Sequence, residues 1–271
     1  MGEHEPDPGL PPTLRRLWRR AERPRRGPKP ALSVDAIVRA AAAIADAEGL
    51  AAVSMARVGD ALGYSAMALY RHVESKDELL ALLADHIAAD LAMPAHAGDW
   101  RSGLHAWTLT QIEAVLARPW FLDLPLATVQ PGPNRVRWLD EAFGVLRGID
   151  LPAAEKLAII GLLAQHVLAE GRVQVEAGRA AAAGARRARG LPADAPVGEL
   201  TPDELAAANP LNDFEAVLRH LAEPADYPHL TEALAGGGDG FAAADPDTDV
   251  DFGLTIVLDG VEAYLRRRGA R

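Results

Sequence analysis

The most constraining feature of the chain is a pair of short apolar-faced segments separated by a glycine, within SMARVGDALGYSAMALYRHVESKDEL at 54–79. Ser54 and Ser65 can each cap the first turn of a short helix, and Gly63 suits the tight turn between the two helices. Gly59 falls where the second helix would cross the first, and a residue without a side chain permits a close crossing. The pattern predicts a helix-turn-helix. Its inward face would consist of Val58, Leu62, Leu69 and Val73.

Other parts of the chain also carry helix signals. Ser33 can cap an apolar stripe that Gly49 would end, which predicts a helix over 33–48. Ser75 and Glu78 have the spacing of a capping box ahead of a further apolar run. Further helices are expected near 100–118, 132–148, 152–189, 212–223 and 249–268, with mobile loops at 190–210 and 236–246.

These patterns predict an all-α fold in three parts. Residues 1–30, which include seven prolines, are expected to form a basic flexible N-terminal arm. Residues 31–77 are expected to form a three-helix DNA-binding domain that contains the helix-turn-helix. Residues 78–271 are expected to form a larger helical domain.

Composition excludes several other classes of protein. The chain of 271 residues is 49% hydrophobic, enough for a substantial core, but no apolar stretch approaches the ~20 residues that cross a bilayer. The chain has no cysteine, which excludes disulfides, thiolate zinc sites and cysteine nucleophiles. Its first residues lack the apolar core of a secretory signal. We therefore expect a cytoplasmic protein with no membrane partner.

Charge is distributed unevenly along the chain. The first 76 residues carry 12 Lys/Arg against 9 Asp/Glu, whereas the remainder carries 16 against 29, so an acidic protein has a basic N-terminal end. We expect its arm, which includes Arg25, Arg26 and Lys29, to wrap DNA and add sequence-independent affinity. Two alternatives stay open: a solvated tail, or a membrane-surface contact through Leu14, Leu17 and Trp18.

Residues 33–80 resemble the tetracycline-repressor (TetR) family of bacterial regulators. The likeness rests on SVDAIVRAAAAIADAEGLAAVSM, on the turn ALGYS and above all on ALYRHVESKDELL at 68–80. A weaker likeness to the family's C-terminal domain lies in RPWFLDLP, GPNRVRWLDEAF and LPAAEKLAIIGLLAQHVLAEGR. The resemblance implies a homodimer, an operator of double-stranded DNA with two half-sites, and release by a small-molecule effector. It thereby implies that residues 78–271 form an effector-binding and dimerisation domain.

The resemblance also implies contacts with DNA phosphates. It makes Tyr70, His72 and Lys76 donors to phosphate oxygens and places Ser54 at a helix N-terminus that meets a phosphate. Each of the three donors has an alternative interpretation. Tyr70 could be partly buried packing, His72 lies nearer the inward side of an ideal helix, and Lys76 could be a solvated charge.

Base edges of the DNA would face Ala66, Met67 and Ala68. Such apolar groups can touch a thymine methyl but form no bidentate hydrogen bond. Arg71, on the same outward face, could supply a guanine or phosphate contact. The alternative for Met67 is an exposed apolar residue without a DNA role.

The expected effector site is an apolar cavity with a few polar anchors. Its candidates are large aromatic residues and polar residues on a mostly apolar helix, for which ordinary packing is the alternative. They are Trp107, Trp120, Phe121, Trp138, Phe143, Gln165, His166 and Glu170. The histidines of the chain lack metal-ligand spacing, so we expect neither a metal nor a cofactor.

Dimerisation is expected to use two long helices from each subunit, paired across a two-fold axis as a four-helix interface. The alternative is that both helices pack within one subunit. The residues of the two stripes are Leu157, Ile160, Ala164, Val167, Leu168, Gly171 and Val175, followed by Phe252, Ile256, Leu258, Val261 and Leu265.

The sequence therefore favours a DNA-binding transcriptional regulator, specifically a repressor released from its operator by a small molecule. The alternative is a constitutive or architectural DNA-binding protein without an effector. An enzyme is not expected, because the chain has no GxSxG nucleophile elbow, no Walker motif and no HExxH zinc motif.

Overall fold

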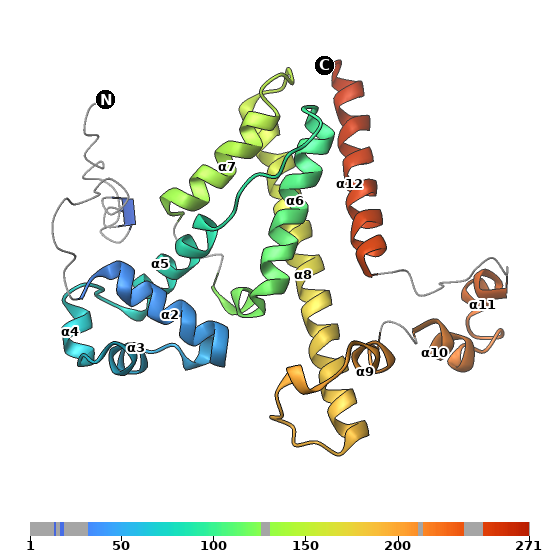
Figure 1. The fold of residues 1–271 in the computed structure, drawn as a ribbon. Helices are drawn as coiled ribbons and strands as arrows, with labels where there is room; N and C mark the ends of the chain where they lie inside the picture. Colours follow the sequence, from blue (N-terminus) through green and yellow to red (C-terminus); the bar gives the residue numbers. More distant parts are fainter. Residues whose placement is uncertain are drawn as a thin grey trace. The chain divides into compact units, whose positions relative to one another are not determined.

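The computed structural model of the chain describes residues 14, 17, 18, 32–125, 131–210, 214–235 and 246–270. These residues form helices joined by turns, with no strand among them, which confirms the all-α prediction (Figure 1). They fall into two compact units. The first lies within 1–168 together with 264–271, and the second lies within 169–263.

Serine caps set the starts of the first helices. At positions 33, 54, 65 and 75, the serine hydroxyl accepts a hydrogen bond of 3.1–3.3 Å from the backbone N–H three residues further on. Gly49 and Gly63, at φ 84° and 75°, end helices in a conformation that glycine adopts without strain. The elements are α2 (Val34–Glu48), η1 (Leu50–Ala52), α3 (Met55–Leu62), α4 (Ala66–Tyr70) and α5 (Lys76–Ala89).

The start of α5 departs from the expected capping box in one contact. Ser75 Oγ accepts from Glu78 N at 3.1 Å, as the pattern predicts. Glu78 Oε2, however, accepts from Glu74 N at 2.7 Å rather than from the cap residue. The carboxylate reaches one residue further back and fixes the turn that leads from α4 into α5.

One hydrophobic core joins the helix-turn-helix to α5. Side chains from α2, α3, α4 and α5 pack in a single cluster with Trp120 of η2 (Pro119–Asp123). Leu79 and Leu83 of α5 are fully buried in this cluster. Packing therefore shows no break at residue 77, where the sequence suggested a domain boundary.

The N-terminal segment contributes to the same core. Leu17 is buried in the cluster, and Trp18 Nε1 donates to Pro131 O at 3.2 Å. A buried Leu17 cannot serve as the membrane contact considered for the arm. Arg25, Arg26 and Lys29 lie outside the described residues. Within the described ranges, no helix has the combined length and hydropathy that a bilayer crossing demands.

The next helices form the body of the first unit: α6 (Trp100–Ala117), α7 (Pro133–Val145) and the start of α8 (Ala153–Arg189). The first two approach closely, since a Cβ on Gly103 would lie only 2.6 Å from Val145 Cγ1. Lys156 Nζ donates to Leu146 O at 2.8 Å and so ties the start of α8 to the end of α7.

The end of α12 (Pro246–Arg268) is held against the start of α8. Tyr264 donates its hydroxyl hydrogen to Glu155 Oε2 at 2.7 Å, and the Arg268 guanidinium pairs with the same carboxylate. The hydrogen bond from Tyr264, with the added bond and charge of Arg268, lowers the pKa of the Glu155 carboxyl. This contact belongs to the first unit.

The prediction of a mobile loop at 190–210 is wrong, because this segment of the second unit folds back on the end of α8. Leu200 packs against Ala182 and Ala185, and Arg186 Nε donates to Ala195 O at 2.9 Å. Thr201 begins a helix with a full capping box, a local signal that sequence reading overlooked. The elements are η3 (Val197–Glu199), α9 (Pro202–Ala207), α10 (Phe214–Leu221) and α11 (Pro228–Ala235). Most of the loop predicted at 236–246 lies outside the described residues.

Candidate DNA-binding surface and effector site

The helix-turn-helix has the close crossing that its glycine requires. A Cβ on Gly59 would lie 2.7 Å from Tyr64 O and 3.3 Å from Ala66 N, so only glycine fits without displacing backbone. Val58, Leu69 and Val73 are fully buried, as predicted. Helix α4 is therefore fixed on α3 with one side turned inward and the other left to solvent.

The outward side of α4 and its sequel presents the predicted DNA contacts. Met67 is 74% exposed and Tyr70 is 44% exposed. Lys76, the first residue of α5, is exposed, and Ser54 caps α3. Exposed Arg71 and His72, together with half-buried Ala66 and Ala68, complete the predicted set.

The alternative interpretation of His72, as an inward-facing residue, is wrong. It assumed that the helix continues through this position, but α4 ends at Tyr70 and His72 lies in the turn that follows. His72 N donates to Leu69 O at 2.8 Å, which tightens the turn. The side chain is exposed as a result, and the geometry of an ideal helix no longer applies to it.

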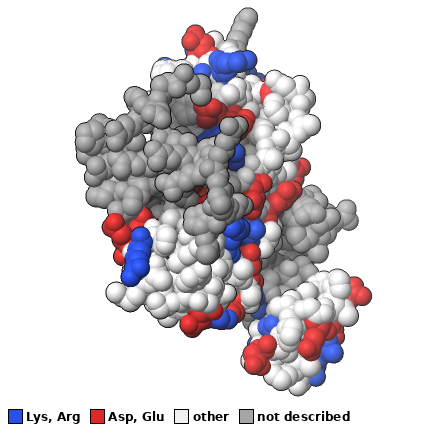
Figure 2. All heavy atoms as spheres, turned by 60° about the vertical axis from the view of Figure 1, so that its left-hand side comes forward, with Lys and Arg blue, Asp and Glu red and all other residues white. Residues whose placement is uncertain are grey.

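Charges on this side of the molecule are mixed. Figure 2 brings forward the side that carries α2, α3 and α4, and shows basic and acidic side chains interspersed among uncharged areas. One such pair is Arg57 on α3 with Glu48 on α2, where the two charges partly neutralise each other. Arg71 and Lys76 are exposed basic groups of the kind that contact phosphates.

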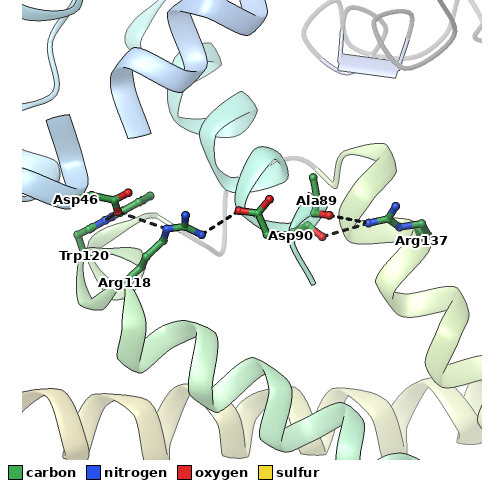
Figure 3. Close-up of polar contacts among 7 residues, drawn as sticks. Asp46, Ala89, Asp90, Arg118, Trp120 and Arg137 are labelled. Carbon is green, nitrogen blue, oxygen red and sulfur yellow. Dashed lines mark hydrogen bonds and ion pairs between the residues drawn. The ribbon is translucent and has the colours of Figure 1, made fainter. Parts of the chain in front are cut away.

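A polar junction connects the helix-turn-helix to the body of the unit. Arg118, at the end of α6, lies 3.4 Å from Asp46 of α2 and 3.2 Å from Asp90 at the end of α5 (Figure 3). Trp120 Nε1 donates to Asp46 Oδ1 at 2.7 Å. One arginine and one indole thus fix the ends of two helices of the DNA-binding region.

A second junction joins α5 to the N-terminus of α7. Asp85 is a buried acidic residue, and its Oδ1 accepts from Asn134 N and Arg135 N, both at 3.0 Å. A side chain on Gly132 would collide with Asp85, since its Cβ would lie 2.3 Å from the carboxyl carbon. Asp85 therefore acts as the N-terminal cap that α7 lacks in its own sequence.

Charge and desolvation oppose each other at this junction. Burial lowers the pKa of the Arg135 guanidinium, and the Asp85 carboxylate raises it in part. Arg137, one turn from the start of α7, donates to Ala88 O at 3.5 Å and Ala89 O at 3.3 Å (Figure 3). Helices α5 and α7 are thus linked at two points along their length.

Two predicted effector residues have buried nitrogen atoms without a hydrogen-bond partner in the described part of the chain: Trp138 Nε1 on α7 and His166 Nε2 on α8. Trp138 stacks on Trp107 of α6, with ring centroids 5.9 Å apart and planes at 11°. Trp107 Nε1, by contrast, donates to Trp138 O at 2.9 Å. An unsatisfied buried polar atom is costly, so these two atoms are candidates for ligand contacts.

Four other predicted effector residues have other surroundings or are exposed. Trp120 and Phe121 pack against the core of the helix-turn-helix, because the turn after Pro119 directs them there. Gln165 is exposed, and Glu170 belongs to the second unit, where it accepts from Gln174. Phe143 is half-buried on α7 and remains a candidate with Trp107, Trp138 and His166.

The predicted dimerisation stripes are largely buried within one chain. On α8, Ile160, Val167 and Val175 are buried, and on α12 so are Leu258, Val261 and Leu265. Three members of the predicted stripes are instead exposed: Leu157 on α8, and Phe252 and Ile256 on α12. Leu162 and Val173, two further apolar side chains of α8, are exposed as well.

Sequence reasoning missed the junction residues Asp85, Asp46 and Arg118. The signal available for Asp85 was its position within the apolar run LLALLADHIAA, where a charged residue facing the core requires a buried partner. Asp46 and Arg118 carried no such signal. Their partners are known only once distant segments are brought together.

A recognition helix on a rigid mount, followed by a larger helical body, defines a helix-turn-helix transcriptional regulator. The chain belongs to the tetR family of bacterial regulatory proteins. Residues 37–83 match the model described as "Bacterial regulatory proteins, tetR family", and residues 93–265 match "Tetracyclin repressor-like, C-terminal domain". It is a DNA-binding transcriptional repressor and not an enzyme, and proteins of this family act as dimers.

Individual relatives agree with this assignment. The HTH-type transcriptional repressor DrrR1 of Streptomyces coeruleorubidus is 32% identical over 265 residues, which cover 94% of this chain and 87% of the relative. Apo ActR of Streptomyces coelicolor has a TM-score of 0.66 at 24% identity, covering 89% of this chain and 100% of its own. ActR in complex with actinorhodin has a TM-score of 0.63 at 26% identity, covering 86% and 98%.

Proposed function

We propose that this repressor binds a two-fold symmetric operator by inserting α4 of each subunit into successive major grooves. The observation that carries the proposal is the exposed outward side of α4 on a mount that tolerates no side chain at Gly59. Met67 and its neighbours would face the base edges, while Tyr70, Arg71, His72 and Lys76 would contact phosphates. Because its partner is chromosomal DNA, we expect the protein in the cytoplasm.

Selection of bound duplexes from a random pool tests operator binding. We expect an enriched inverted repeat whose half-sites are about one helical turn apart, near 34 Å, or a multiple of it. An architectural protein would instead bind all duplexes alike, with an affinity that depends on salt but not on sequence. Enrichment of no sequence would reject the repressor proposal.

Phosphate contacts have their own test. Lys76→Ala should weaken binding to the selected operator and to random DNA by similar factors, and should reduce the slope of log affinity against log salt by about one unit. Arg172→Ala, on the exposed side of α8, is the matched control. An unchanged slope in Lys76→Ala would show that this ammonium group does not contact DNA.

We further propose that an effector binds beside Trp138 and His166. A planar, largely apolar molecule with oxygen atoms suits these residues, because it could stack on an indole and accept from Trp138 Nε1. The protein known as ActR binds actinorhodin in its solved complex. By similarity we expect an aromatic effector here.

The switch would pass through α7 and α5. Trp138 lies one turn after Asn134, whose backbone N–H is held by Asp85 of α5. A ligand that displaces Trp138 would therefore move α5, at whose other end Lys76 follows the recognition helix. Such a ligand must bind the DNA-incompetent state more tightly than the DNA-bound state.

Displacement from the selected operator tests the switch. A panel of aromatic compounds is titrated while tryptophan fluorescence and operator affinity are both followed. We expect compounds that quench the fluorescence to weaken operator binding, and Trp138→Phe to reduce the affinity of those compounds. Compounds that quench the fluorescence yet never change operator affinity would contradict the proposal.

A further inference from the structure

The N-terminal end of α4 presents an unusually apolar side to solvent. Met67 is 74% exposed, the highest value among the large hydrophobic side chains in the described ranges. Its neighbours Ala66 and Ala68 are half-buried and end in methyl groups. An apolar side chain this exposed gains nothing from the fold, so its chemistry is available to a partner.

Polar groups near α4 lie at other positions. The hydroxyl of Ser65 accepts from Ala68 N at 3.3 Å as a helix cap. Tyr70, Arg71 and His72 come at the C-terminal end of α4 and in the turn beyond it. In helix-turn-helix complexes the N-terminal residues of the recognition helix meet base edges. The base-reading end of this helix therefore offers carbon and sulfur atoms instead of hydrogen-bonding groups.

Major-groove chemistry limits what such a surface can select. Adenine, guanine and cytosine present donors or acceptors there, whereas thymine adds a C5-methyl group beside its O4. A donor or acceptor covered by the Met67 side chain would lose water without gaining a hydrogen bond. A methyl group, in contrast, loses nothing by leaving water and gains apolar contact.

We propose that Met67, flanked by Ala66 and Ala68, is a specificity-determining residue that selects thymine through its C5-methyl group in each operator half-site. The inference rests on the proposed operator binding and adds the base that is selected and the atom that is contacted. Affinity then comes mainly from the phosphate contacts, and sequence selection at these positions comes from methyl burial.

Replacement of thymine by deoxyuridine isolates the methyl group, because deoxyuridine keeps the pairing and the O4 acceptor. Thymines in the enriched half-sites are replaced one at a time, and affinity is measured by fluorescence anisotropy. We expect one or two positions per half-site at which the loss of one methyl weakens binding by about fourfold. At the remaining positions the replacement should have no effect.

Protein variants identify the residue that contacts the methyl. With Met67→Ala, the loss of affinity that deoxyuridine causes at those positions, the deoxyuridine penalty, should shrink towards onefold. Because the Met67 side chain is exposed, this substitution should leave the fold intact. With Met67→Gln, a new selection should replace thymine by adenine, which glutamine can bind through two hydrogen bonds. Leu221→Ala, at an exposed leucine of α10, is the control and should leave the penalty unchanged.

Each outcome has a distinct meaning. A pool that enriches no duplex overturns operator binding itself, and the inference with it. An enriched operator that tolerates deoxyuridine everywhere overturns only the thymine inference. A penalty of the same size in Met67→Ala and in the unmodified protein shows that another residue contacts the methyl, and also overturns the inference.

Discussion

At the scale of single residues, Gly59 sets the geometry of the DNA-binding surface. We predict that Gly59→Ala destabilises the protein by roughly 1–3 kcal/mol, the usual cost of overpacking, because its Cβ would lie 2.7 Å from Tyr64 O, a backbone atom that cannot rotate away. Operator affinity should fall as well, since α4 must shift. Thermal unfolding and anisotropy measure the two effects.

Gly144→Ala provides the matched control for this glycine. Gly144 lies within α7, and a Cβ there would meet nothing within 4 Å. Alanine should stabilise that helix by roughly 0.5–1 kcal/mol. Equal effects of the two substitutions would mean that the crossing of α3 and α4 is looser than the structure indicates.

Asp85 is the residue on which the α5–α7 junction depends. Asp85→Ala removes the acceptor of Asn134 N and Arg135 N and the charge that favours the Arg135 guanidinium, so we predict a loss of about 2 kcal/mol. Asp85→Asn keeps one acceptor oxygen and should lose less. Exposed Asp140→Ala on α7 is the control. Denaturant unfolding would contradict this prediction if all three variants matched the unmodified protein.

At the scale of helices, local chemistry decides what the sequence can predict. The start of α2, the end of α3 and the buried stripe of α2 were predicted because serine caps, glycine turns and periodic apolar residues act within a few positions of one another. The same reasoning failed for α9, where proline and glycine nearby suggested a loop although Thr201 and Glu204 form a capping box.

Contacts between distant segments were beyond local reasoning. Trp120 was assigned to an effector site because of its size, yet its partner Asp46 lies 74 positions away. Asp85 and Arg135 are likewise 50 positions apart. Apolar periodicity found a stripe on α8 that packs inside the chain, and it could not tell an internal face from a face that meets a second subunit.

The contact between α12 and α8 predicts a pH dependence. Hydrogen bonds from Tyr264 and Arg268 hold the pKa of Glu155 below its ordinary value of 4.5. A lowered pKa in the folded state means that the contact stabilises fully above that ordinary value and is lost as pH falls through the lower one. We predict that Glu155→Gln lowers the melting temperature at pH 7.

The gap in melting temperature should close as the medium becomes acidic. Once the pH falls below the lowered pKa of Glu155, both proteins carry a neutral side chain at position 155, so their melting temperatures should converge. Glu113→Gln, at an exposed glutamate of α6, should show no gap at either pH. A gap of constant size from neutral to acidic pH would mean that the carboxylate charge does not contribute to the contact.

At the scale of the whole molecule, function requires two copies of the chain, because one recognition helix reads only one half-site. Most of the predicted stripe on α12 is internal, so its exposed members, Phe252 and Ile256, are the best candidates for the subunit interface. We predict that Ile256→Glu, which would place a charge in an apolar interface, converts the dimer to a monomer of 28.8 kDa.

The same substitution connects assembly to DNA binding. The unfolding temperature of an isolated Ile256→Glu subunit should change little, because the side chain is 55% exposed. Operator affinity should fall steeply, because the two recognition helices are no longer joined in one dimer that binds both half-sites. Sedimentation velocity gives the mass and anisotropy gives the affinity. Leu221→Glu, at a side chain 66% exposed on α10, adds the same charge away from α12 and should change neither quantity. If Ile256→Glu remained dimeric, the interface would have to lie on the exposed leucines of α8 instead.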